Sequence, residues 1–144
     1  MKSLEQVLAL KGHGIISVHA DDKVLTALNL MAQHDIGALL VLEDGQPVGI
    51  FSERDYARKV VLLGRTSKDT PVRMVMSEKI LCVTNSETVE ECLSIMTHHH
   101  IRHLPVTGAD GEVVGFLSIG DLVKETISEQ AFVIGQLEHY ITHG

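Results

Sequence analysis

The sequence predicts an α/β (α+β) fold made of two β-α-β-β-α repeats, and three observations support this prediction. Residues 15–41 match residues 80–106 at an offset of 65 positions. After one inserted residue, residues 44–55 match residues 110–121 at an offset of 66. In both copies, apolar residues at helical spacing alternate with short apolar runs in the same order. A repeat of this length identifies a supersecondary unit, and we expect the two copies to bury their apolar faces against each other.

The first copy begins with a short strand at residues 15–18, after which Asp21-Asp22 supplies the N-cap of a helix. Apolar residues then recur at helical spacing up to about His34, which predicts an amphipathic helix. Two apolar runs follow, at residues 37–42 and 48–51. Because an Asp-Gly turn separates these runs, we expect a β-hairpin.

A second helix closes each copy. In the first copy Ser52 caps it, and it extends to about Leu63 and ends at Gly64. The second copy repeats the order of elements: a strand at 80–83, a helix at 87–98, strands at 104–107 and 113–117, and a helix from Ile119. The predicted organisation is an N-terminal helix at 1–12, the first repeat at 13–66, a connecting helix at 67–79, the second repeat at 80–126, and a C-terminal helix at 127–144.

Composition narrows the class of protein. No apolar run of about 18 residues could cross a bilayer, and the N-terminus lacks the apolar stretch of a secretory signal, so we expect a soluble, cytoplasmic protein. Cys82 and Cys92 fall at apolar-phased positions and are expected to be buried, reduced thiols. The formal net charge of -7 argues against binding to nucleic acid, because such binding relies on clustered cations. Seven of the 12 Lys and Arg residues nevertheless lie between positions 54 and 79, which suits a small anion or a solvated charged face.

The clearest candidate site is a Ser-x-x-Asp motif that occurs once per copy. Ser52 and Asp55 in the first copy correspond to Ser118 and Asp121 in the second. At a strand-to-helix turn, this spacing places a hydroxyl and a carboxylate beside the free N–H groups of a helix N-terminus. A carboxylate there can accept hydrogen bonds from both hydroxyls of a ribose. The alternative is that both pairs are helix N-caps alone.

Two other groups of residues are weaker candidates. His98, His99, His100 and His103 could be a solvated helix end, a titrating neighbour of an anion site, or a metal site. Because adjacent residues on a helix point about 100° apart, one metal could reach only a subset, and we predict no metal site. Gly12-His13-Gly14 lacks the Lys-Ser/Thr ending of a phosphate loop and is predicted to be a turn.

The repeated motif resembles a known family. Gly49-Ile50-Phe51-Ser52-Glu53-Arg54-Asp55 and Gly115-Phe116-Leu117-Ser118-Ile119-Gly120-Asp121, in tandem, are similar to the ligand motif of cystathionine-β-synthase (CBS) domains. Two such domains form a Bateman module. The stretch Ile101-Arg102-His103-Leu104-Pro105-Val106 resembles the family's first hairpin strand in its ligand-binding form. The resemblance implies two repeats packed through their sheets with pseudo-two-fold symmetry, and flanking terminal helices.

The resemblance also implies an adenosine-binding cleft at the second motif, which we call the Asp121 cleft. Its expected residues are Ser118, Asp121, Arg102, His103, Pro105, Ile16, Ile36 and Gly37. Arg102 and His103 are expected to bind phosphate, and the planar fork of Arg102 makes it the stronger candidate. Ile16, Ile36 and Gly37 of the first repeat are expected around the base.

A second cleft is expected at the first motif, and we call it the Asp55 cleft. Its expected residues are Ser52, Asp55, Arg54, Arg58, Leu81 and Ile101. The counterparts of Arg102 and His103 in the first repeat are Gly37 and Ala38. We therefore rank the Asp121 cleft first for phosphate, unless Arg54 or Arg58 reaches into the Asp55 cleft.

These features predict a non-catalytic regulatory module. The expected ligand is AMP, with ATP, ADP or NAD as alternatives, and the bound nucleotide is expected to signal energy or redox state to a separate partner protein. Candidate nucleophiles and acid–base groups do not converge on one place, which argues against an enzyme. The apolar terminal helices suggest a homodimer, and a ligand-independent dimerisation scaffold is the competing prediction.

Overall fold

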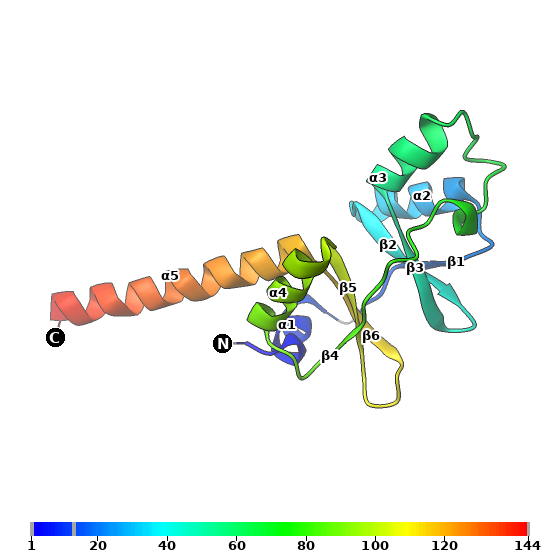
Figure 1. Cartoon of the computed structure of the whole chain (residues 1–144). Helices are drawn as coiled ribbons and strands as arrows, with labels where there is room; N and C mark the ends of the chain where they lie inside the picture. Colours follow the sequence, from blue (N-terminus) through cyan, green and yellow to red (C-terminus); the bar gives the residue numbers. More distant parts are fainter. Residues whose placement is uncertain (1, 13, 144) are drawn as a thin grey trace.

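The structure is a computed structural model that describes residues 2–12 and 14–143. His13, within the predicted Gly12-His13-Gly14 turn, lies outside the described residues. The two predicted repeats are present, each with a three-stranded mixed sheet (Figure 1). In each sheet the first strand is parallel to the second and the third is antiparallel to it: β1 (Ser17–His19), β2 (Ala38–Glu43) and β3 (Gln46–Ser52) in the first repeat, and β4 (Val83–Thr84), β5 (His103–Thr107) and β6 (Val113–Ser118) in the second.

Helices cover one face of each sheet and form a core there. Over the first sheet lie α2 (Val24–His34), the short α3 (Glu53–Asp55) and the π-helix η1 (Tyr56–Val61) that continues it. Over the second lie α4 (Val89–His99) and the start of α5 (Ile119–His143). The predicted cap of α2 was wrong, because its N-cap is Lys23 without a side-chain hydrogen bond. Asp22 instead accepts a 2.8 Å hydrogen bond from the backbone N–H of His19.

The other faces of the two sheets form the contact between the repeats. Strand β2 alternates between the two cores: Leu39 and Val41 face the helices of the first repeat, whereas Ala38 and Leu40 join a separate apolar cluster. Phe116 of β6 packs against this second cluster. Both faces of β2 are therefore buried, which explains its nearly continuous apolar sequence.

Each repeat is completed by the segment that precedes the other repeat. Helix α1 (Leu4–Lys11) lies before the first repeat but buries Leu4, Val7 and Leu8 in the core of the second. The 3-10 helix η2 (Val72–Met74) and its neighbours precede the second repeat but bury Val72, Val75 and Met76 in the core of the first. The expected connecting helix at 67–79 is only this single 3-10 turn.

Two glycines at equivalent positions of the repeats, Gly49 and Gly115, allow these segments to pack closely. A Cβ added at Gly115 would lie 2.5 Å from Cδ2 of Leu8, and one at Gly49 would lie 2.6 Å from Sδ of Met76. Leu8 and Met76 thus rest directly on the backbone of β6 and β3. A side chain at either position would force Leu8 or Met76 to shift, which is why glycine suits these two positions.

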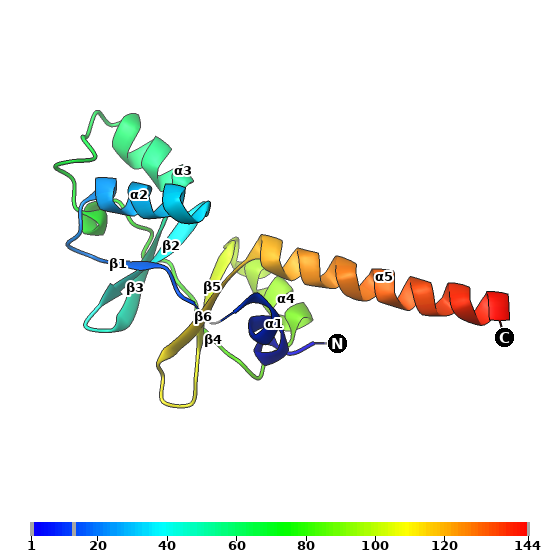
Figure 2. The ribbon, with the colours of Figure 1, turned by 180° about the vertical axis from the view of Figure 1, so that it is seen from behind.

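The C-terminal helix is not a separate element. Helix α5 runs without a break for 25 residues, from the second motif through the segment that was expected to form its own helix at 127–144. Residues 121–134, on both sides of the predicted boundary, contain no Pro or Gly that could end the first helix, so the two predicted helices merge. Beyond its first turns, α5 extends away from the rest of the protein (Figures 1 and 2).

The two cysteines differ from the expectation. Cys92 on α4 is fully buried, as predicted, but Cys82 is exposed in the segment leading to β4. The strand that was expected at residues 80–83 does not include Cys82, because β4 begins only at Val83 and has two residues. Among the described residues, no helix has the length and hydropathy needed to cross a membrane.

Candidate functional site

Two cavities lie at the boundary between the repeats, one at each Ser-x-x-Asp motif. The Asp55 cleft has a volume of about 550 Å³ and combines the first motif with residues 100–103 at the start of β5. The Asp121 cleft has a volume of about 380 Å³ and combines the second motif with residues 35–38 at the start of β2. Each cleft therefore takes its carboxylate from one repeat and its opposite wall from the other.

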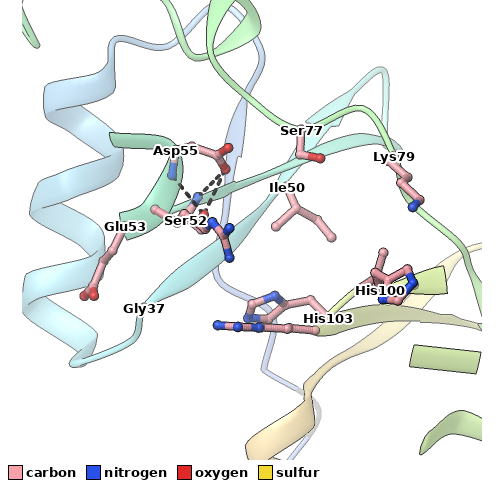
Figure 3. Close-up of a pocket in the computed structure, with 12 residues that line it drawn as sticks. Gly37, Ile50, Ser52, Glu53, Asp55, Ser77, Lys79, His100 and His103 are labelled. Atoms are coloured by element: carbon pink, nitrogen blue, oxygen red, sulfur yellow. Dashed lines mark hydrogen bonds between the residues drawn. The ribbon is translucent and has the colours of Figure 1, made fainter. Parts of the chain in front are cut away.

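In the Asp55 cleft, Ser52 and Asp55 hold each other in a reciprocal capping box (Figure 3). Ser52 donates to Oδ2 of Asp55 from its backbone N–H at 3.0 Å and from its hydroxyl at 2.9 Å. The backbone N–H of Asp55 donates to Oγ of Ser52 at 3.2 Å. Nζ of Lys59, one turn later, lies 3.0 Å from Oδ1 of Asp55. The Asp55 carboxylate therefore makes three polar contacts, and its side chain is only 12% exposed.

In the Asp121 cleft the same box forms, but its lysine comes from a distant part of the chain. Ser118 N–H donates to Oδ2 of Asp121 at 2.9 Å, and Asp121 N–H donates to Oγ of Ser118 at 3.1 Å. Nζ of Lys11, the last residue of α1, donates to Oδ2 of Asp121 at 2.6 Å and to the carbonyl of Phe116 at 2.9 Å. Burial would raise the pKa of Asp121, but the hydrogen bonds from Lys11 and Ser118 outweigh it and hold that pKa below its ordinary value.

The charged groups of the two clefts differ. The side chains of Arg54, Lys79 and Arg102 line the Asp55 cleft together with the carboxylates of Glu53 and Asp55, so the cations exceed the carboxylates by one. Lys11 lines the Asp121 cleft together with Asp35 and Asp121, so there the carboxylates exceed the cations by one. Among the described lining residues, the Asp55 cleft is thus the more favourable for an anion.

His103 lies between the two clefts and lines both. Its ring stacks on that of Phe116, with centroids 5.5 Å apart and an interplanar angle of 13°. Burial lowers the pKa of His103; the carboxylate of Asp121 opposes this shift, and the cations Lys11 and Arg102 add to it. The folded protein therefore favours the neutral imidazole at this position.

Most residues expected in the Asp121 cleft are found together. Ser118, Asp121, His103, Ile16, Ile36 and Gly37 all line it. Arg102 does not meet the expectation, because it lines the Asp55 cleft. Pro105 is buried within β5, where it pairs with Phe116. The repeat symmetry that places Ile101 beside Asp55 also places the adjacent Arg102 there.

The Asp55 cleft also differs in part from the expectation. Ser52, Asp55, Arg54 and Ile101 line it. Leu81 instead packs against the core of the second repeat, and Arg58 is exposed on η1. The Asp121 cleft was ranked first for phosphate because Arg102 was expected to line it. Arg102 and Arg54 both line the Asp55 cleft instead, so this reason for the ranking no longer holds.

Sequence reasoning missed several lining residues. Lys79 and Gly14 lie 65 positions apart, each just before the predicted first strand of a repeat, and line the Asp55 and Asp121 clefts respectively. The repeat offset could have identified this pair. No such signal points to Lys11, which belongs to a terminal helix outside the repeats. Within residues 2–12 and 14–143, no group of three or more His, Cys, Asp or Glu side chains is placed to hold a metal ion.

Two β-α-β-β-α repeats, with a Ser-x-x-Asp motif at each of two clefts between them, define a tandem-repeat module of the α/β class. A family model described as the CBS domain matches residues 11–62 and again residues 72–128. The chain belongs to the CBS-domain family, as a tandem pair or Bateman module.

Three similar proteins illustrate this relationship. The chain is 40% identical over 129 residues to the mitochondrial CBS domain-containing protein CBSX3 of Arabidopsis thaliana; the match covers 86% of this chain and 62% of that protein's length. A solved structure of a protein with CBS domains from Burkholderia ambifaria MC40-6 is 45% identical, with a TM-score of 0.83, over 90% of this chain and 96% of that one.

The CBS domain pair of protein MJ0100, solved in complex with 5'-methylthioadenosine and S-adenosyl-L-methionine, is 19% identical with a TM-score of 0.76 and covers 90% of this chain and 98% of that one. At this level of identity the likeness extends to the fold alone.

Proposed function

We propose that this protein is a non-catalytic regulatory module that binds adenosine nucleotides in its two inter-repeat clefts and signals energy or redox state to a separate partner protein. The observation that carries the proposal is the presence, in both clefts, of a Ser–Asp capping box whose carboxylate lines a cavity. A pair that served only as an N-cap would have no need to face a cavity of several hundred Å³.

The carboxylates have the chemistry that a ribose requires. A carboxylate offers about four lone-pair positions. The contacts of Asp121 with Ser118 and Lys11 occupy two of these, which leaves acceptor positions for two ribose hydroxyls. In the Asp55 cleft, Ser52 and Lys59 make three contacts, so a ribose there must displace one of them. The ligands bound to the protein MJ0100 also contain an adenosine group, which supports this ligand class.

Charge assigns the phosphates to the Asp55 cleft in this proposal. Arg102 and Arg54 supply planar donors that match phosphate oxygens, and Lys79 adds a third cation. The larger volume of this cleft suits the longer ligands ATP, ADP or NAD. The smaller Asp121 cleft, with Lys11 among its described lining residues, suits AMP. AMP remains the first choice of ligand overall, because it can enter both clefts.

The competing proposal is a scaffold that dimerises without a ligand. The observation that favours it is the apolar surface exposed along α5. Thermal melting distinguishes the two, because a ligand at 100 times its Kd adds about 2.7 kcal/mol to the folded state. Melting should be measured with AMP, ADP, ATP, NAD and 5'-methylthioadenosine. We expect a clear increase in Tm with at least one of them. No change with any of these compounds would favour the scaffold.

A further inference from the structure

Helix α5 carries an apolar stripe along the part that leaves the protein body. Its members are spaced by four, seven, three and four residues: Val123, Ile127, Ile134, Leu137 and Ile141. Each is exposed, from 43% for Val123 to 81% for Ile141. Gln130 fills the one remaining position of the same heptad pattern. This spacing is typical of the seam of a coiled coil.

The exposed helix needs a packing partner. Leu122 is fully buried in the second core, whereas its neighbour Val123, the first member of the seam, is exposed. The distal part of α5 extends away from both sheets (Figure 2). Most helical stability in proteins comes from packing an apolar face, and within the described residues the seam of α5 has no such packing.

We propose that α5 pairs with α5 of a second copy of this chain in an antiparallel coiled coil. In one register, every residue of the seam packs against a seam residue of the second copy. It places Ile127 against Leu137 of the second copy and Ile141 against Val123, while Ile134 meets Gln130. Because the arrangement has two-fold symmetry, each contact occurs twice, as in the isologous interfaces of common dimers.

The charges beside the seam favour this same register. Lys124 and Glu138 occupy the same heptad position, seven residues before and after Ala131. Antiparallel pairing centred near Ala131 therefore places each Lys124 beside Glu138 of the other copy, and the small Ala131 beside itself. A parallel pair would leave Lys124 and Glu138 without these partners. Because this pattern is complementary to itself, we identify the partner of α5 as a second copy of this chain. The pairing does not depend on nucleotide binding.

The first test is the mass of the full chain in solution, by light scattering and sedimentation. We expect a dimer for the natural sequence and a monomer for the double variant Ile134→Glu, Leu137→Glu. The matched control combines Phe132→Glu with Gln136→Glu, which places the same two charges at exposed residues of α5 outside the seam, and which should remain dimeric. Retention of the helical circular dichroism and cooperative melting of the protein body would show that the double variant is folded. A monomeric natural protein, or a dimer that survives the double substitution, would overturn the proposal.

The second test addresses direction. Lys124→Glu and Glu138→Lys should each raise the dimer dissociation constant about tenfold, and their combination should restore it. In a Cys82→Ser background, nitroxide labels at Ala131→Cys should be close together in the dimer. Labels at Tyr140→Cys should be separated by roughly 24 Å along the helix axis, given a rise of 1.5 Å per residue. Equally short distances at both positions, or no recovery in the charge-swapped chain, would contradict the antiparallel arrangement.

Discussion

Nζ of Lys11 lies 2.6 Å from Oδ2 of Asp121, and this contact joins the end of α1 to the carboxylate of the Asp121 cleft. A second ion pair, between Lys2 and Glu125, holds the other end of α1 to the same helix α5. Between them, Leu8 rests on the backbone of Gly115. Any ligand that draws Lys11 away from Asp121 therefore also changes how α1 is attached to the second repeat.

Lys11 is expected to set the preference of the Asp121 cleft for phosphorylated ligands. In an Asp55→Asn background, which isolates this cleft, Lys11→Met should weaken AMP binding several-fold and leave adenosine binding unchanged or slightly tighter, because the cation is lost and the carboxylate is freed. Calorimetry with both ligands measures the ratio. Lys2→Met removes the other α1 ion pair and is the matched control. Equal losses for AMP and adenosine would show that Lys11 acts only on the fold.

Gly115 is expected to be intolerant of a side chain. Gly115→Ala should destabilise the protein by about 1–3 kcal/mol, because the new Cβ would overlap Leu8 of α1. Urea unfolding measures the change. At Gly120 the nearest atom to an added Cβ is Oγ of Ser118 at 3.5 Å, so Gly120→Ala should change stability little. In a Leu8→Ala background the cost of Gly115→Ala should fall; a cost that stays the same would place the clash elsewhere.

His103 is expected to make the protein less stable in mild acid. Its pKa is lower in the folded state than in the unfolded chain, mainly through burial and the cations Lys11 and Arg102, against the pull of Asp121. The unfolded chain therefore takes up a proton first. The stability from neutral His103 is complete above the unfolded pKa of about 6.5 and is lost as pH falls below it.

Unfolding free energies measured from pH 7.5 down to pH 5.5 test this expectation. His103→Gln should give a shallower decline than the natural chain, because one proton-linked group is removed. The remaining histidines provide the common background in both proteins. Two curves with the same slope would mean that His103 titrates alike in the folded and unfolded states.

The two thiols are expected to react at very different rates. Burial, together with Glu87 and Glu91, raises the pKa of Cys92 to about 12, and its side chain is fully buried. Cys82 is exposed, although partial burial also raises its pKa. A thiol reagent at neutral pH should therefore modify Cys82 in the native protein and Cys92 only after unfolding. Mass spectrometry of the peptides distinguishes this from modification of both thiols in the native state.

The fold could be predicted because the repeat supplies each element twice. The hairpin strands and both Ser-x-x-Asp caps follow from local patterns that tertiary packing does not override. The short first strand of each repeat was placed too early, because β1 begins at Ser17 and β4 at Val83. Two helix boundaries were predicted wrongly. No helix-ending residue separates the two halves of α5, which form one continuous helix. The connecting helix expected at 67–79 is only the 3-10 turn η2. The predicted burial of Cys82 was wrong for a similar reason. The spacing of apolar residues does not determine where a short strand begins, and β4 begins only at Val83.

The site was only partly predictable. Local motifs placed Ser52, Asp55, Ser118 and Asp121, and repeat symmetry placed Ile36 and Ile101. The same symmetry, applied to the residue after Ile101, would also have placed Arg102 in the Asp55 cleft. Lys11 reaches its cleft only because α1 completes the second repeat, and no spacing between Lys11 and Asp121 could have shown that contact.

Calorimetric titration with AMP of the natural chain, of Asp55→Asn and of Asp121→Asn tests the central claim most directly. Asparagine can keep the cap by accepting from Ser52 or Ser118, but it cannot accept both ribose hydroxyls as a carboxylate does. Asp110→Asn, in an exposed turn, controls for the change of charge. We predict two binding events in the natural chain and in the control, loss of one event in Asp55→Asn, and loss of the other event in Asp121→Asn. Binding that is unchanged in both cleft variants would contradict the account.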